Sequence, residues 1–365
     1  MTTWNKRADN VVHELDPYNA EPHTAALAQN HLTAINTFYS RNHGPIPDIG
    51  VAEWTTALTV PGAAPVELTF DELRSQFTTV TLAATLQCAG NRRRGFLEIR
   101  DIPGEDPWGP GATSTASWRG VRLGDVLRST GVDVDVLGPG MHVAFTGPDI
   151  SDIASPPQRY GSSIPLTKAL SEETLLAFEM NDQPLPRIHG GPVRVVVPGF
   201  IGARSVKWVD SITVQDHPSD NYFQAVAYRV LAPDVDPSTA GPGDGISLSS
   251  VALNCDFLTP AQHSTVQPGP VTVHGYAFAG DDRSIERVEI SADDGHTWAE
   301  AELHDENGPW VWRLWSAVID IEPGRTDLLA RAWDNTAATQ PESAAQLWNP
   351  KGYVNNSWAH LNLNT

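Results

Sequence analysis

The sequence predicts a mixed α+β domain followed by an all-β domain. Its 365 residues exceed the usual length of one domain. Strand-like apolar runs alternate with short helical segments up to about residue 230, and beyond the Pro-, Gly-, Ser- and Asp-rich segment Ala232–Gly245 the pattern is nearly all strand. We therefore expect a first domain over residues 1–235, with an N-terminal arm over about 1–35, and a second domain over 245–365.

The first domain is expected to contain strands and short helices in alternation. Thr69-Phe70-Asp71-Glu72 has the composition of a helix start. The run 192–198 is apolar and ends at a proline, which is typical of a buried strand. The remaining patterns predict strands over 79–87 and 141–145, a short helix over 122–127 and a longer helix over 167–181.

The second domain is expected to be a β-sandwich of immunoglobulin-like size. Glycine, aspartate, asparagine and proline turns separate its short apolar runs, and several of these runs contain tryptophan. Evenly spaced short strands of this kind are typical of two packed sheets. The predicted strands cover 271–278, 287–291, 310–315 and 326–334.

Charge and cysteine content restrict the classes of function. A formal net charge of −20 argues against general binding to nucleic acids or anionic membranes. The two cysteines cannot form a disulfide framework, and no CxxC metal pair exists. The start has no apolar signal-peptide region, and no run approaches the length of a membrane span. We expect a cytoplasmic protein.

The motif QCAGNRRRG at 87–95 places Cys88 directly before three arginines. Adjacent guanidinium groups favour a thiolate, the form that binds soft metals, and they also bind oxyanions. Three interpretations are open at this point. Cys88 and Arg94 have the C-x5-R spacing of a phosphatase loop, although the flanking residues differ from that pattern. Cys88 could equally be a buried core residue, or a metal ligand at an anion site.

Two further segments combine basic and polar residues with turn formers. Arg41-Asn42-His43 precedes Gly-Pro-Ile-Pro, so it is either a plain loop or one that binds an anionic substrate and a cofactor. The second segment places glycines beside basic and hydroxyl side chains around the strand at 192–198, where backbone N–H groups can approach a phosphate. We expect an anionic cofactor here, with His189, Arg194, Ser205 and Lys207 as the candidate residues.

Taken in order, the motifs resemble the sulfite oxidase family of molybdenum-cofactor enzymes. The resemblance covers nearly the whole chain, and its first half is most similar to the haem-free plant-type enzymes. It has no cytochrome b5-like segment and no CxxCH haem site. The pieces that carry it are FYSRNHGPIP, LQCAGNRRRGF, WGPGATSTASW, NDQPLPRIHGGPVRVVVPG, GARSVKWV, WRLW and WNPKGY.

The resemblance implies one molybdenum–molybdopterin cofactor per subunit, without haem, and oxidation of sulfite to sulfate. Electrons would leave to an external acceptor, oxygen or a cytochrome, and the second domain would form a homodimer. Cys88 would bind the metal. Arg41 and Arg93 would bind the substrate anion, Trp108 would line its pocket, and Tyr228 would hydrogen-bond near the reacting oxygen, with Tyr222 as the competing assignment. The cofactor would be held by Arg41, Asn42, His43, Asp149, His189, Arg194, Ser205 and Lys207.

One departure concerns the substrate pocket. Family sulfite oxidases carry arginine in a WNxRG motif, whereas this sequence has Lys351 in WNPKG. Lysine keeps the charge but lacks the two-pronged geometry of the guanidinium group. A related molybdenum reductase of nitrate or a sulfoxide is therefore an alternative, although Lys351 and Tyr228 favour sulfite. A non-enzymatic binding protein that retains the fold is the third hypothesis. Cys255 matches no site and is interpreted as a core residue.

Overall fold

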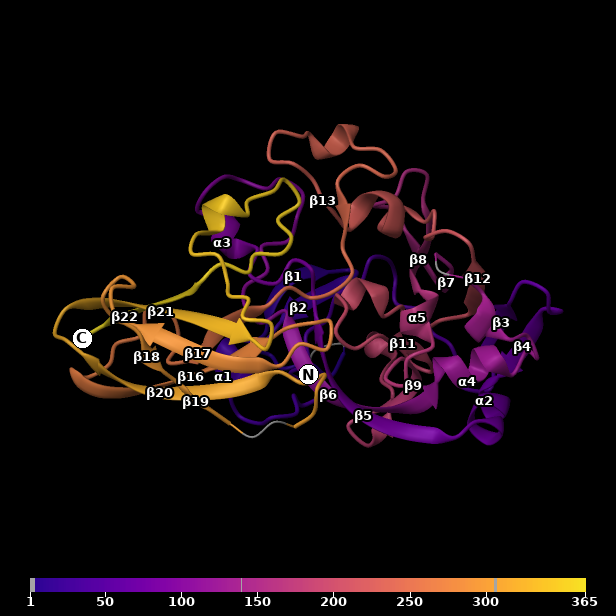
Figure 1. Ribbon diagram of the computed structural model, residues 1–365, viewed down its shortest axis with the longest axis horizontal. Helices are drawn as coiled ribbons and strands as arrows, with labels where there is room; N and C mark the ends of the chain where they lie inside the picture. Colours follow the sequence, from indigo (N-terminus) through magenta and orange to yellow (C-terminus); the bar gives the residue numbers. More distant parts are fainter. Residues whose placement is uncertain (1–3, 139, 305–306) are drawn as a thin grey trace.

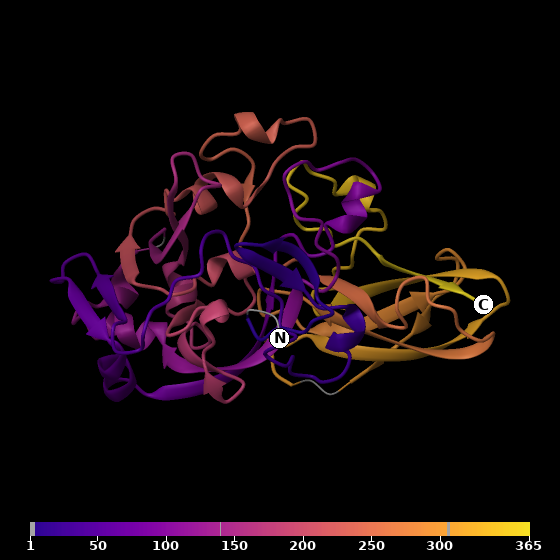
Figure 2. The ribbon, with the colours of Figure 1, turned by 180° about the vertical axis from the view of Figure 1, so that it is seen from behind.

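The computed structural model describes residues 4–138, 140–304 and 307–365, so residues 1–3 of the expected arm lie outside it. The fold is mixed and rich in strands. Figure 1 and the reverse view in Figure 2 show the C-terminal strands at one end of an elongated molecule. The first sheets lie at the other end, and the N-terminal strands lie between the two. Among the described residues, no helix has both the length and the apolar character needed to cross a membrane.

An antiparallel sheet, a mixed sheet and short helices build the larger part of the fold. One sheet has the order β10-β9-β6-β5, with β11 also paired to β9, and the other has the order β4-β3-β12-β7-β8. The strands are β3 (Thr55–Thr59), β4 (Val66–Thr69), β5 (Thr79–Gln87), β6 (Thr113–Arg122), β7 (His142–Ser151), β8 (Gln158–Pro165), β9 (Leu175–Met180), β10 (Gln183–Pro184), β11 (Arg194–Val196) and β12 (Ser211–Gln215). The helices are α2 (Phe70–Gln76), α3 (Arg94–Leu97), α4 (Leu123–Arg128), α5 (Leu166–Ala169), η1 (Val134–Val136), η2 (Arg187–His189), η3 (Gly202–Arg204) and η4 (Phe223–Ala227).

Several predicted elements are confirmed. The strand at 79–87 is β5, the helix predicted over 122–127 is α4, and the strand at 141–145 is the first half of β7. Helix α2 follows Thr69, whose hydroxyl accepts a hydrogen bond from the Glu72 N–H while the Glu72 carboxylate accepts from the Thr69 N–H. This reciprocal pair satisfies two helix-end donors and fixes where the helix begins.

The helix predicted over 167–181 is wrong. Only α5 is helical there, and the chain then forms β9. Leucine, alanine, glutamate and methionine favour helices in isolation, but β9 pairs with β6, β10 and β11. Five of its six residues are buried, so the strand is covered on both faces. Packing in the sheet therefore overrides local propensity.

The N-terminal arm is a structured hairpin followed by a short helix. Its elements are β1 (Val11–Leu15), β2 (Tyr18–Glu21) and α1 (Thr24–Leu27). The buried Glu21 carboxylate accepts hydrogen bonds from the backbone N–H groups of Gly109 (2.6 Å) and Gly111 (2.9 Å). These bonds attach the hairpin to the loop that begins at Trp108.

The segment 232–245 forms an excursion at the surface. It leaves β13 (Arg229–Val230), passes through η5 (Pro237–Thr239) and returns as β14 (Ile246–Ser247), which pairs antiparallel with β13. Most of its residues are exposed. The composition that made it a linker candidate therefore corresponds to a solvated loop closed by two short strands.

The C-terminal part consists of two four-stranded sheets around a shared apolar core. Cys255 lies in this core, as expected, and burial raises the pKa of its thiol. The sheet orders are β15-β16-β20-β19 and β18-β17-β21-β22. The elements are β15 (Asn254–Thr259), β16 (Gly269–Phe278), β17 (Ile285–Ser291), β18 (Ala299–Glu300), β19 (Glu302–Leu303), β20 (Arg313–Ile321), β21 (Arg325–Asp334), η6 (Ala344–Gln346) and β22 (Ala359–Asn364).

The strand predicted over 310–315 begins only at residue 313. The three preceding residues contact the first part of the chain instead. The Thr85 N–H donates to the Trp310 carbonyl, and the Trp312 N–H donates to the Thr85 hydroxyl, both at 2.9 Å. Trp312 also joins the larger core, together with Tyr276 and other residues. The two parts of the molecule therefore share one continuous apolar contact.

Arg92 links the two parts through buried polar contacts. Its Nε lies 2.7 Å from Asp256 Oδ2, and its other nitrogens donate to the carbonyls of Ser357 (2.7 Å) and Trp358 (3.0 Å). Burial raises the pKa of Asp256, although Arg92 opposes that shift. Breaking such a pair by removing one partner leaves a buried charge without compensation.

We expect Arg92→Met to lower the free energy of unfolding by about 3 kcal/mol, because Asp256 and two carbonyls lose their donors. Denaturant unfolding followed by fluorescence measures this. The control is Arg94→Met, which makes the same substitution at an exposed neighbouring residue. A loss below about 1 kcal/mol would contradict the contribution assigned to this contact.

Candidate active site

One cavity collects most of the candidate residues. It encloses about 630 Å³ of space not filled by atoms, part of which is open to solvent. Its lining brings together ten residues predicted from the sequence: Arg41, Asn42, His43, Cys88, Asp149, His189, Arg194, Ser205, Lys207 and Tyr228. Arg93, Trp108 and Lys351 do not line it. These residues come from loops and strand ends that are far apart in the sequence.

Cys88 directly follows β5, at the end of a buried strand. Its N–H donates to the Ala112 carbonyl (2.9 Å), and the Gly90 N–H points at its sulfur (3.4 Å). Burial raises the pKa of the Cys88 thiol, and the nearby Arg93 and Arg41 only reduce that shift. The expectation that arginines alone make this thiol ionise easily is therefore wrong. A bound metal ion would reverse this balance, because a coordinating thiol is deprotonated.

The phosphatase interpretation of Cys88 and Arg94 finds no geometric support. Arg94 begins helix α3 and its side chain is exposed, whereas Cys88 is buried in the wall of the cavity. A phosphate loop needs the thiol and the arginine to face one ligand together. The sequence spacing of the two residues is therefore coincidental.

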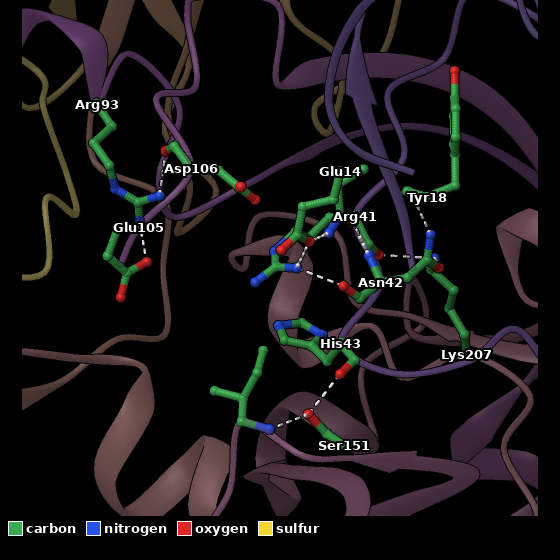
Figure 3. Close-up of polar contacts among 12 residues, drawn as sticks. Glu14, Tyr18, Arg41, Asn42, His43, Arg93, Glu105, Asp106, Ser151 and Lys207 are labelled. Atoms are coloured by element: carbon green, nitrogen blue, oxygen red, sulfur yellow. Dashed lines mark hydrogen bonds and ion pairs between the residues drawn. The ribbon is translucent and has the colours of Figure 1, made fainter. Parts of the chain in front are cut away.

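The N-terminal hairpin holds the Arg41-Asn42-His43 loop in place (Figure 3). Asn19 accepts a hydrogen bond from the Asn42 N–H (2.5 Å), and the Asn42 amide donates to the Tyr18 carbonyl (2.6 Å). The Ser151 hydroxyl donates to the His43 carbonyl (2.5 Å). Two separate elements, β2 and β7, thus fix this loop, which explains why its side chains can line a cavity.

His43 and Tyr228 form a buried polar pair. The His43 Nε2 lies 2.6 Å from the Tyr228 hydroxyl, and the imidazole stacks on Tyr160 with ring centroids 4.5 Å apart. Burial and the cations Arg41 and Lys207 lower the pKa of His43, and burial raises the pKa of Tyr228. Both groups are therefore neutral near pH 7. Tyr222 packs edge-on against Phe223 and does not line the cavity.

The basic side chains of Arg194 and Lys207 form another side of the cavity. Arg194 donates to the carbonyls of His189 (2.8 Å) and Ser205 (2.9 Å), while Lys207 donates to those of Arg41 (2.9 Å) and Ile188 (3.1 Å). Burial lowers the pKa of Arg194 to about 10 and lowers that of Lys207 well below its ordinary value. Burying these charges is unfavourable unless an anion compensates them.

Lys6, which the sequence analysis missed, contacts this side of the cavity through His189. Its ammonium lies 2.6 Å from His189 Nε2 and donates to the carbonyls of Ile35 (2.7 Å) and Phe38 (2.8 Å). If Lys6 is charged, its ammonium is the donor in this contact and the His189 Nε2 accepts. Burial and neighbouring cations, Lys6 first, lower the pKa of His189 accordingly. A lone lysine near the start of a polar arm carries no sequence pattern that predicts this contact.

Asp149 is the one acid in the cavity lining. It is buried, and its Oδ1 has no hydrogen-bond partner among the described residues. Burial raises the pKa of Asp149 to about 7, although Lys207 opposes the shift. A buried acceptor of this kind is suited to a ligand that supplies N–H donors.

Arg93 and Lys351 meet beside the cavity rather than in its lining. The Arg93 Nε donates to the carbonyls of Lys351 and Gly352, both at 3.2 Å, and Nη1 donates to the Asp106 carbonyl at 2.8 Å. Glu105, another residue that the sequence analysis missed, contacts both basic side chains. Trp108 is fully buried, with its ring 4.4 Å from that of His13.

The cavity suits an anionic ligand that carries a metal next to Cys88. It presents several buried cations and a single acid with an unused acceptor, and close glycines shape its walls. A Cβ at Gly202 would lie 2.7 Å from the Tyr39 hydroxyl, for example. No group of three or more histidine, cysteine or acidic side chains forms a metal site within the described parts of the chain. A metal bound by Cys88 would therefore need further ligands from the cofactor itself.

Family models define the class of the protein. Residues 43–223 match the oxidoreductase molybdopterin-binding domain, and residues 247–365 match the Mo-co oxidoreductase dimerisation domain. The protein is therefore a molybdopterin oxidoreductase.

Similar proteins of known function then identify the family of the chain. It is 38% identical to sulfite oxidase of Gallus gallus over 95% of this chain and 76% of that protein, and 38% identical to sulfite oxidase of Arabidopsis thaliana over 96% and 93%. The chain belongs to the sulfite oxidase family. It spans 64% of mitochondrial sulfite oxidase of Homo sapiens and 41% of a nitrate reductase of Hordeum vulgare, at 37% and 36% identity.

A solved structure has the same fold. The sulfane dehydrogenase SoxCD of Paracoccus pantotrophus superimposes with a TM-score of 0.79 at 24% identity, covering 97% of this chain and 86% of that chain. The likeness confirms the arrangement of the mixed first part and the strand-rich second part.

The raised pKa of Asp149 predicts a pH dependence of stability. Its folded pKa of about 7 lies above its ordinary value of 3.8, so the folded state binds more protons between those values and stability falls as pH rises. Relative to Asp149→Asn, cofactor-free wild-type protein should lose about 1.4 kcal/mol per pH unit from pH 5 to 7 and level off above. Unfolding curves over this range measure the difference, and the exposed Asp152 supplies a matched Asp→Asn control. Equal slopes for wild type and Asp149→Asn would show that Asp149 titrates normally.

Proposed function

We propose that the protein oxidises sulfite to sulfate with a molybdenum–molybdopterin cofactor and passes the electrons to an external acceptor. The observation that carries this proposal is the position of Cys88. This buried thiol lines a cavity together with basic side chains. The same cavity contains Asp149, whose Oδ1 has no hydrogen-bond partner among the described residues. The similarity to sulfite oxidases over almost the whole chain supports it.

Different cavity residues are assigned to different parts of the cofactor. Cys88 supplies the protein thiolate for the metal, since soft ligands suit it. Arg194, Lys207, Ser205 and His189 hold the anionic end, with Asn42 and His43 beside them. Asp149 accepts from ring N–H groups. When bound, the cofactor supplies two-electron oxygen-atom transfer.

Three basic residues are assigned to the substrate anion. Arg41 lines the cavity, while Arg93 and Lys351 lie beside it, and Trp108 supports that side from the core. Burial lowers the pKa of Arg41, but neighbouring ionisable groups, among them Asp106 and Glu105, raise it overall, so Arg41 stays charged. Positive groups placed in advance stabilise an oxyanion at little cost in reorganisation.

Tyr228 is the residue assigned to hydrogen bonding and proton movement near the substrate. Its hydroxyl is neutral, buried and already paired with His43 at 2.6 Å. A neutral hydroxyl in this position can donate a hydrogen bond to an oxygen of the substrate, while His43 holds its orientation. Tyr222 lacks this position, so Tyr228 is the better assignment.

The remaining features follow from the same family. We infer an immunoglobulin-like sandwich from residue 245 that forms a homodimer, preceded by a catalytic domain over residues 1–235. We also infer a cytoplasmic enzyme without its own haem, so that electrons pass to oxygen or a cytochrome. The dimerisation-domain match over residues 247–365 supports the homodimer, and static light scattering tests it.

A nitrate reductase is the second candidate, because a barley nitrate reductase is 36% identical over 95% of this chain. The two functions differ in direction. Sulfite with ferricyanide tests oxidation, and nitrate with reduced viologen tests reduction, on the same preparation. Turnover of nitrate alone would overturn the proposal.

We expect Cys88→Ser to abolish sulfite-dependent ferricyanide reduction, because a hydroxyl is a poor ligand for a metal that favours thiolate. Molybdenum content and the absorption band of the thiolate–metal bond are measured on the same sample. Cys255→Ala, in the core of the second part, is the control that should keep both activity and spectrum. Full activity of Cys88→Ser would exclude the ligand role.

We expect Arg93→Gln to raise the sulfite KM about tenfold to a hundredfold while kcat falls less, because a charge-assisted contact to the anion is lost. Arg94→Gln makes the same change at an exposed neighbour and should leave KM unchanged. Steady-state kinetics at fixed ionic strength separates the two parameters. Unchanged KM in Arg93→Gln would remove Arg93 from the substrate site.

A further inference from the structure

We propose that Glu105 is a specificity-determining residue that stands in the place of the substrate oxyanion between Arg93 and Lys351. It lowers the affinity of the site for anions, and for dianions most of all. This inference rests on the proposed function, which assigns Arg93 and Lys351 to an oxyanion. It concerns an acid that none of the site assignments above includes.

The contacts of Glu105 reproduce those that a small oxyanion would make. Its Oε2 lies 3.1 Å from Arg93 Nη2, and its Oε1 lies 3.5 Å from Lys351 Nζ (Figure 3 shows the contact with Arg93). One carboxylate thus bridges two cations that come from distant parts of the chain. Sulfite and sulfate also present oxygens that can bridge two donors, so they compete for the same positions.

Arg93 does not depend on Glu105 for its position. Three backbone carbonyls already accept from its Nε and Nη1, and its guanidinium lies 5.2 Å from the centre of the Tyr353 ring. Only Nη2 is directed to Glu105. Removing the carboxylate therefore leaves Arg93 fixed and frees one of its donors for an anion.

Lys351 and Glu105 are partly open to solvent, unlike Arg93. Their side chains are 17% and 19% exposed, whereas the Arg93 side chain is 3% exposed. A lysine is also a point charge that can turn from one acceptor to another, unlike the planar fork of arginine. An arriving anion can thus displace the carboxylate from both cations.

The remaining negative charge sets a preference among anions. A displaced Glu105 stays close to the bound anion and repels it in proportion to the anion's charge. A dianion such as sulfate is penalised about twice as much as a monoanion such as hydrogen sulfite. The residue therefore favours hydrogen sulfite, the protonated form of the substrate, over the dianionic product and assists product release.

The test measures anion binding to the holoenzyme. Sulfate is titrated into wild type and Glu105→Gln by calorimetry, and nitrate serves as the monoanion probe. We expect Glu105→Gln to bind sulfate about tenfold more tightly, with a smaller gain for nitrate. Inhibition of turnover by sulfate should strengthen by the same factor.

Two further variants make the result specific. Glu98→Gln removes the same charge from an exposed position after α3 and should change neither binding constant by more than about twofold. Glu105→Ala should match Glu105→Gln, which excludes an effect of the glutamine amide. Weaker sulfate binding in both Glu105 variants would show that Glu105 positions Arg93 instead. Equal binding in wild type and variants would show that it does not stand in the anion's place.

Failure of the proposed function remains distinguishable. If wild type does not oxidise sulfite but the Glu105 variants gain sulfate affinity, the assigned reaction is wrong and the inference about Glu105 holds. If wild type oxidises sulfite but the Glu105 variants bind sulfate no more tightly, the assigned reaction holds and the inference about Glu105 is wrong.

Discussion

Buried positive charge is the constraint on which the site depends. Arg194, Lys207 and Lys6 lose most of their contact with water, and the pKa of each is lowered by burial. Arg194 and Lys207 line the cavity, and Lys6 contacts its lining through His189. Among the described residues the lining contains one acid, Asp149, whose own pKa is raised. A pocket with this excess of cations is unfavourable without its ligand. Its existence therefore indicates an anionic group that completes the charge balance when it binds.

The protein limits this cost by surrounding the cations with backbone carbonyls. Arg194, Lys207 and Lys6 each donate to at least two carbonyls that lie in loops or in the short helix η2, outside the sheet ladders. Loops can turn their carbonyls inwards because they are not committed to strand pairing. The N-terminal hairpin also fixes one of these loops in place, because it forms hydrogen bonds with Asn42. The arm is thus part of the site, although its sequence suggested only a covering segment.

The comparison of sequence and structure separates what local pattern can predict from what it cannot. β5 and α2 were predictable because their patterns agree with their surroundings, and ten cavity residues were predictable because ordered motifs carried them. The helix over 167–181 failed, since a central strand can be built from residues that favour helices. Lys6 and Glu105 were missed because single charged residues acquire meaning only from distant partners. The ionisation of Cys88 was misjudged for a related reason. Sequence shows the arginines beside it but not the burial that outweighs them.

The three consecutive arginines explain why the catalytic loop and the C-terminal part depend on each other. Arg92 has a positive φ of 65°, which turns the chain so that its side chain runs to Asp256 in the second part. Arg93 then faces Lys351 and Gly352, and Arg94 faces solvent. The C-terminal segment is hydrogen-bonded to the same loop, because the Val354 N–H donates to the Ala89 carbonyl and the Asn355 side-chain amide donates to the Arg92 carbonyl. The loop that carries Cys88 therefore reaches its final shape only when the C-terminal segment is docked. Arg93 and Lys351, which we propose to bind the substrate anion, come from different parts of the chain. They can meet at one place because the contacts that align them also join the two parts.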